Sequence, residues 1–202
     1  METTMSLVYY SFRDDVTTSQ LGGYLDELAQ FVSQAPLCLP LNPQRISDTC
    51  ASRIREVDQD SFINAVASIT EILFDCGYEH AVGIFLCDLH HRIAKLAIQA
   101  NRHALWGAAY DGIAFVYGEM GRYVVWHETL HLFGADDCYE LPNEGPTCNL
   151  TNCIMQYAPT TTRVGNWPFL CEENISRVRG SGSSEVQVDN AEPGAAPDPG
   201  SI

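Results

Sequence analysis

The chain has 202 residues, enough for one compact domain with a substantial hydrophobic core. Its composition is that of a globular protein except for its charge, because 26 acidic residues against 11 basic ones give a formal net charge of −15. This excess argues against nucleic acid or an anionic membrane as a partner, since both repel an acidic protein. No apolar run in the sequence approaches the length of a transmembrane helix.

The N-terminal part of the chain predicts a strand followed by an amphipathic helix. Residues 6–13 alternate as a strand does and include β-branched and aromatic side chains. From Thr17 onward apolar residues recur at helical spacing, and Gln20 completes a capping box with Thr17 at the start of this helix. Residues 36–50 contain several prolines and are expected to form a loop.

The next segments predict a second helix, a buried strand and two short segments around a turn. The helix is expected over residues 61–75, and residues 81–87 have the apolar composition of a buried strand. Residues 105–109 and 113–117 flank Tyr110-Asp111-Gly112, which has the composition of a turn. This pair of segments lies directly before the most informative motif of the chain.

That motif, HExxH, occupies residues 127–131 and indicates a zinc site. His127 and His131 are four residues apart, so they lie on one face of a helix and their imidazoles can bind the same Zn²⁺ ion. Glu128 projects beside the metal, where a general base for hydrolysis is needed. The alternative is that these are ordinary polar residues on a buried helix, since HExxH alone also occurs by chance.

The residues after the motif supply a third ligand. Gly134 can adopt the left-handed conformation that ends a helix and turns the chain. Catalytic zinc usually takes three protein ligands and leaves one position open, and Asp137, three residues after the glycine, has the spacing that is required. Its neighbour Asp136 does not. The complete pattern, HExxHxxGxxD, occurs by chance far less often than HExxH alone.

A methionine follows further along the chain, in the sequence Cys-Ile-Met-Gln-Tyr that contains Met155 and Tyr157. With this methionine the chain resembles the metzincin clan of zinc peptidases, whose pattern is HExxHxxGxx(H/D) followed by a methionine-containing turn, the Met-turn. The resemblance implies that Met155 forms an apolar base under the ligands and that Tyr157 ligates the metal or stabilises the transition state. The alternatives are that Met155 fills the core and that Tyr157 is a surface aromatic.

Within this clan the chain resembles the archaemetzincins over residues 106–178. That family has a cysteine directly after the third ligand, a Cys-x-Met sequence at the turn and a Cys-x-x-Cys sequence in the last helix. Its four cysteines bind a second zinc ion. Cys138, Cys153 and Cys171 match the first three of these positions.

The chain departs from the archaemetzincin pattern at three places. The third ligand is Asp137 where that family has histidine. The stretch before the Met-turn is longer and contains an additional Cys148, and the position three after Cys171 is Asn174. The aspartate is instead similar to the snapalysin group of small metzincins, which the chain also resembles in Tyr139, two residues after the ligand.

Four cysteines of this region have two interpretations. As thiolates they would hold a second, structural Zn²⁺, with Cys148 in place of the missing fourth family cysteine. As disulfides they would join Cys138 to Cys148 and Cys153 to Cys171. Residues 1–15 have neither a basic start nor an apolar run of secretory length, which favours a cytoplasmic location and reduced thiols. A trimmed, secreted form is the alternative, because the total of eight cysteines is even.

The resemblance implies an α+β fold of metzincin type, with a mixed twisted sheet and helices above a cleft and a small irregular C-terminal lobe below it. This lobe would contain the Met-turn and a terminal helix. We expect one catalytic domain over residues 1–179, with an upper lobe of residues 1–134 and a lower lobe of residues 135–179.

The end of the chain is expected to contain a helix and a tail. The helix is predicted to begin near Asn166, with Pro168 in its first turn, and to end by Val178. Residues 180–202 are rich in Gly, Ser, Pro and acidic residues and are expected to be disordered.

These features predict a zinc-dependent peptidase with Glu128 as general base and acid, acting on a peptide or protein substrate, and a monomer. The substrate would lie extended along an edge strand at residues 113–117, and residues 156–160 would line the pocket after the scissile bond. The competing interpretation is a peptide-binding or regulatory zinc protein with little turnover, against which an intact Glu128 argues. A hydrolase of a non-peptide amide is a third interpretation.

Overall fold

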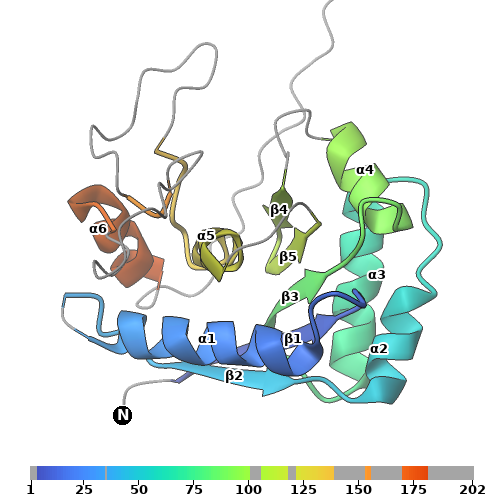
Figure 1. Ribbon diagram of the computed structural model, residues 1–202, viewed down its shortest axis with the longest axis horizontal. Coiled ribbons are helices and arrows are strands. Elements are labelled where there is room, and N and C mark those ends of the chain that lie inside the picture. The colour runs from blue at the N-terminus through green and yellow to red at the C-terminus, as the bar shows by residue number, and fades with distance from the viewer. Residues whose placement is uncertain are drawn as a thin grey trace, which may run out of the picture.

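The computed structural model describes residues 4–34, 36–100, 106–117, 122–138, 153–155 and 170–181. These residues form an α+β fold in which a mixed five-stranded sheet carries helices on both faces (Figure 1). The strands are β1 (Met5–Ser11), β2 (Leu41–Arg45), β3 (Val82–Leu86), β4 (Gly107–Tyr110) and β5 (Ile113–Val116). The helices are α1 (Thr18–Ser33), α2 (Asp48–Arg55), α3 (Phe62–Asp75), α4 (Arg92–Ala100), α5 (Arg122–His131) and α6 (Glu172–Ser181). The expected fold class is therefore confirmed.

The strand order β2-β1-β3-β5-β4 places β4 at one edge of the sheet. Neighbouring strands are parallel except for β4, which is antiparallel to β5. Asp111 and Gly112 connect these two strands with φ angles of 46° and 77°. Positive φ at both positions gives the tight turn that matches the twist of an antiparallel pair. The expectation that residues 113–117 form the edge strand is wrong, because β5 lies between β3 and β4.

Successive side chains along a strand point to opposite faces of the sheet, so the core is divided into two clusters, one on each face. Leu7 and Leu86 contact the cluster that contains the buried residues of α1 and α5, and α6 adds Val178 to it. Val8 and Phe85 contact the cluster that contains the buried residues of α2, α3 and α4. The sheet therefore lies between two helical layers (Figure 1).

The predicted helices α1 and α3 and the predicted strands β1 and β3 are confirmed, with ends that differ by a few residues. At the start of α1, the Thr17 hydroxyl accepts a hydrogen bond from the Gln20 amide at 3.2 Å, and the Gln20 side chain accepts one from the Thr17 amide at 2.8 Å. This is the expected capping box. The helix buries its apolar stripe against the sheet, with the residues Leu21, Leu25, Leu28 and Val32.

The loop expected over residues 36–50 is wrong, because this segment contains β2 and the start of α2. The strand was hidden by its composition, which includes Pro43 and polar side chains on both sides. Such a sequence is compatible with a strand only at a sheet edge, where the missing N–H of proline faces away from the neighbour. β2 has such a position, since β1 is its single partner within the described sheet.

The C-terminal helix also differs from its predicted bounds. α6 begins at Glu172, whereas Leu170 and Cys171 before it are not helical, and it extends beyond Val178 to Ser181. Asn166 and Pro168, where the helix was expected to begin, lie outside the described residues, as do residues 182–202 of the predicted tail. In the part of the chain that the structure describes, no helix is both long and apolar enough to span a bilayer.

Candidate metal centre

Helix α5 carries the HExxH motif and is fixed by its apolar side. Val125, Trp126 and Leu130 are buried in the core cluster beneath α1. The indole N–H of Trp126 donates a hydrogen bond to the carbonyl of Tyr24 in α1 at 2.8 Å. The ring of Phe31, also in α1, stacks on this indole with ring centroids 6.0 Å apart. Because these contacts fix the rotation of α5 about its axis, its histidines face the opposite side.

The turn after α5 brings the chain back toward the histidines. Gly134 has φ 86°, its amide donates to the carbonyl of His131 at 3.0 Å, and the amide of Ala135 donates to the carbonyl of Leu130 at 3.1 Å. This pair of hydrogen bonds, with a left-handed glycine, is the Schellman end of a helix. The role expected for Gly134 is therefore confirmed, and Asp137 follows directly after this turn.

Three side-chain atoms converge at this point. The Nε2 atoms of His127 and His131 are 3.1 Å apart, and Oδ1 of Asp137 lies 3.0 Å from the first and 3.2 Å from the second. Around a tetrahedral zinc ion with bonds of about 2.0–2.1 Å, ligand atoms stand about 3.3 Å apart. The triangle therefore has nearly the dimensions of one face of a zinc tetrahedron, and the residues present fit the metal.

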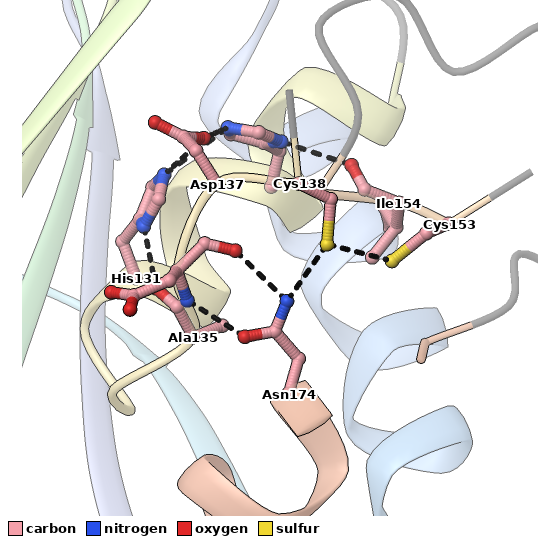
Figure 2. A network of polar contacts seen from close by, with 9 residues as sticks. His131, Ala135, Asp137, Cys138, Cys153, Ile154 and Asn174 are labelled. Carbon is pink, nitrogen blue, oxygen red and sulfur yellow. Dashed lines mark hydrogen bonds and ion pairs between the residues drawn. The ribbon is translucent and has the colours of Figure 1, made fainter. Parts of the chain in front are cut away.

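Both imidazoles are oriented by backbone carbonyls on their far side (Figure 2). Nδ1 of His127 lies 2.9 Å from the carbonyl oxygen of Ile154, and Nδ1 of His131 lies 2.7 Å from that of Ala135. A carbonyl can only accept, so each Nδ1 carries a proton, and in the neutral rings the lone pairs belong to Nε2. Two lone pairs and a carboxylate oxygen then face one another, an arrangement that a cation stabilises.

The charges around His131 favour its protonated form. Burial alone lowers the pKa of His131, but the hydrogen bond with Asp137 and the negative charges of Glu128 and Asp137 outweigh it, so the pKa is raised. A metal ion requires neutral imidazoles, so protons and metal compete for the same atoms.

Glu128 lies beside the cluster, with its side chain packed against β4. It is 7 % exposed, and an added β-carbon at Gly107 would lie 2.5 Å from Glu128 Cγ and nearer still to its carboxyl group. Burial raises the pKa of Glu128, and Asp137 adds to the rise, whereas positive charge on His127 and His131 lowers it. A carboxyl group with a raised pKa suits proton transfer near neutral pH.

Sequence reasoning missed two residues that shape the surroundings of Glu128. Gly107 leaves the space that the carboxyl group fills, and the Tyr117 hydroxyl donates a hydrogen bond to the Gly107 carbonyl at 3.2 Å. Burial raises the pKa of Tyr117, and the nearby Glu128 charge adds to it, so this phenol stays protonated as a donor. Both residues belong to the β4–β5 hairpin, and the local sequence contains no signal for either role.

The segment of Cys153, Ile154 and Met155 lies against the histidine side of the site. Ile154 provides the carbonyl that orients His127, and the Met155 carbonyl accepts a hydrogen bond from the amide of Cys138 at 2.8 Å. The Met155 side chain is fully buried in the core cluster that includes α5. Its role as a base under a metal stays a prediction.

Several residues predicted to belong to the site, Cys148, Tyr157 and residues 156–160, lie outside the described residues, as does Tyr139.

A second metal-capable cluster consists of Cys138, Cys153 and Cys171, all buried. The sulfur of Cys138 lies 3.6 Å from the sulfur of Cys153 and 3.6 Å from the sulfur of Cys171. Thiolates on a tetrahedral zinc ion stand about 3.8 Å apart, so the cluster also fits a metal. Burial raises the pKa of Cys153 to about 11. Cys153 and Cys171 are not joined by a disulfide bond in the part of the chain that the structure describes. The choice between a second zinc ion and disulfides stays a prediction, because Cys148 lies outside the described residues.

Comparisons with known proteins give one similar solved structure. The crystal structure of archaemetzincin from Methanopyrus kandleri superimposes with a TM-score of 0.48 at 15 % sequence identity, and the match covers 90 % of this chain and 97 % of that chain. No family model matches the chain, and no curated protein matches it.

Proposed function

We propose that this chain is a zinc-dependent peptidase. The observation that supports the proposal most directly is the convergence of the His127 and His131 Nε2 atoms and the Asp137 Oδ1 atom within 3.2 Å of one another. Two neutral imidazoles and one carboxylate are a common ligand set of catalytic zinc in hydrolases. A zinc ion bound there supplies a Lewis acid that polarises a carbonyl group and lowers the pKa of water.

Glu128 provides the proton transfer that hydrolysis of an amide requires. Its carboxyl group adjoins the ligands without being one of them, and its raised pKa allows it both to accept and to return a proton. Glu128 takes a proton from the attacking water and later gives it to the departing amine nitrogen. The packing against Gly107 holds the carboxyl group in one place for both transfers.

The substrate is proposed to lie extended along β4 rather than β5. The amide of Tyr117 donates to the carbonyl of Trp106, and hydrogen-bonded pairs alternate along an antiparallel ladder. The backbone groups of Ala109 therefore point away from β5, toward the edge of the sheet. An extended peptide can pair with these groups as an added strand. Because α5 contacts β4, this edge adjoins the helix that carries Glu128.

The test combines metal content with turnover. The purified chain and its Glu128→Gln variant are analysed for zinc by mass spectrometry and incubated with a mixture of unstructured peptides, whose cleavage is followed by mass spectrometry. We expect cleavage by the wild type, loss of cleavage in the variant, and the same zinc content in both. His127→Ala serves as a control and should lose zinc from this centre.

Turnover that survives within a factor of about two in Glu128→Gln would contradict the role of this residue. Zinc bound through His127 without any cleavage would instead support the competing peptide-binding function.

A further inference from the structure

Asn174 is a buried polar residue of α6 whose side chain contacts the loop that carries Asp137. It is 2 % exposed. Its Oδ1 atom accepts a hydrogen bond from the amide of Asp136 at 2.8 Å, and its Nδ2 atom donates one to the carbonyl of Asp136 at 2.8 Å (Figure 2). The amide side chain thus pairs with the backbone of one residue as a neighbouring strand would.

The same amide also reaches the residue on the other side of Asp137. Nδ2 of Asn174 donates a second hydrogen bond to the sulfur of Cys138 at 3.2 Å. The orientation of the amide is fixed by its partners, because a backbone N–H can only donate and a backbone carbonyl can only accept. One side chain therefore holds both neighbours of Asp137.

Other contacts fix the ends of this part of the loop, and the Asp136 carboxylate also pairs with Arg177 of α6. The backbone hydrogen bonds of the helix end stop at Ala135, and the amide of Cys138 donates to the Met155 carbonyl. The backbone N–H and the backbone carbonyl of Asp136 both form hydrogen bonds with the Asn174 side chain. Asn174 is therefore one of the contacts that hold the backbone on both sides of Asp137.

We infer, on the basis of the proposed metal centre, that Asn174 is a positioning residue that directs the carboxylate of Asp137 toward His127 and His131. It raises the affinity of this centre for zinc without touching the metal. It also joins the centre to the cysteine cluster, since Asn174 contacts the backbone before Asp137 and the thiol after it. A cysteine at position 174 has one sulfur, a weak donor and a weak acceptor, in place of the two separate atoms with which Asn174 pairs with Asp136, so the asparagine has a role of its own in this chain.

Asn174→Asp is the most informative variant. An ionised aspartate has nearly the same shape and still accepts the hydrogen bond from the Asp136 amide, but it cannot donate to the Asp136 carbonyl or to Cys138. Val178→Ala is the matched control, because Val178 is fully buried on the same helix and packs in the core. This control destabilises α6 without removing a hydrogen bond of Asn174.

The experiment measures the zinc dissociation constant of the full chain by competition with a chelator, together with the thermal unfolding midpoint. Zinc binding that is lost in the His127→Ala variant is assigned to the proposed centre, and the dissociation constant of this binding is the quantity compared. Residues that orient a ligand typically contribute 10–100-fold in metal affinity, so Asn174→Asp should weaken zinc binding by about this factor. Val178→Ala should lower the unfolding midpoint and leave the dissociation constant unchanged.

An unchanged dissociation constant in Asn174→Asp would overturn the inference, and so would equal weakening in Asn174→Asp and Val178→Ala. If Asn174→Asp does not fold, Asn174→Ser decides, because its short, neutral hydroxyl cannot replace both hydrogen bonds to Asp136. A wild-type chain without His127-dependent zinc binding would refute the proposed function itself. If only the positioning role of Asn174 is wrong, the wild type still binds zinc through His127, and the Asn174 variants bind it with the same dissociation constant.

Discussion

The carboxyl group of Glu128 packs against the α-carbon of Gly107, with no room between them for a side chain. This contact joins α5 to the edge strand β4, so the group proposed to transfer protons rests on the strand that is proposed to bind substrate. Glycine is required at position 107 because of this close approach. Its backbone conformation does not require glycine, since its φ angle is not positive.

Gly107→Ala should therefore displace the Glu128 carboxyl group or push β4 outward. A displacement of about 1 Å at a catalytic group can lower turnover about 100-fold, and we expect a loss of this order in kcat. Zinc content should stay unchanged, because the three atoms nearest to the added methyl group all belong to Glu128 and none to a proposed ligand. Gly23→Ala in α1 is the control, since nothing lies within 4 Å of its added β-carbon. Full turnover in Gly107→Ala would show that the carboxyl group does not need this position.

The two neighbouring aspartates should differ in their effect on zinc. Asp137→Ala removes a converging oxygen and should lose most of the His127-dependent zinc, measured as metal per chain. Asp136→Ala removes a carboxylate that pairs with Arg177 at the surface, while Asn174 still binds the Asp136 backbone. Zinc content should then stay near that of the wild type. The reverse result would move the third ligand to Asp136.

The cysteine cluster should hold a second metal. We expect two zinc ions per chain in protein purified under reducing conditions, and Cys171→Ser should remove one of them and lower the thermal unfolding midpoint, since structural zinc contributes to folding free energy. Cys38→Ser, at an exposed thiol, should change neither quantity. A reduced and active chain with one zinc would show that the cluster is a set of buried thiols.

Alkaline pH should destabilise the fold through its buried thiols. Burial raises the pKa of Cys87 to about 12 in the folded state, whereas an unfolded cysteine has a pKa of about 8.5. The unfolded chain therefore loses this proton first, so the free energy of unfolding is unaffected below about pH 8.5 and decreases as pH rises toward 12. Each such thiol contributes a slope of at most about 1.4 kcal/mol per pH unit. Cys87→Ala should lower this slope in denaturant titrations at successive pH values, and an unchanged slope would contradict the assignment.

The sequence predicted those parts of the fold that depend on residues close together in the chain. The capping box of Thr17 and Gln20, and the turn at Gly134, depend on residues within a few positions of each other, so they are visible in the sequence. The strand β2 was missed because its polar composition fits a strand only at a sheet edge, which no local pattern reveals. Helix α4 was not predicted either.

The site shows the same division. His127, His131 and Asp137 were predicted as metal ligands from their spacing, and the structure brings together side-chain atoms that could hold a metal ion. Asn174 was visible only as a departure from a cysteine pattern, because its partner Asp136 lies 38 residues earlier in the chain. Contacts of this kind depend on how distant segments pack, which the sequence of either segment does not contain.

The Schellman turn after α5 sets the direction in which the chain leaves the helix, and it also sets the length of loop needed to reach the histidines. Its two hydrogen bonds end at Ala135, so the number of residues from there to position 137 determines where that side chain lies. One inserted or deleted residue would direct a neighbouring side chain to this point instead. The position of the Asp137 side chain relative to His127 and His131 therefore depends on the length of this loop.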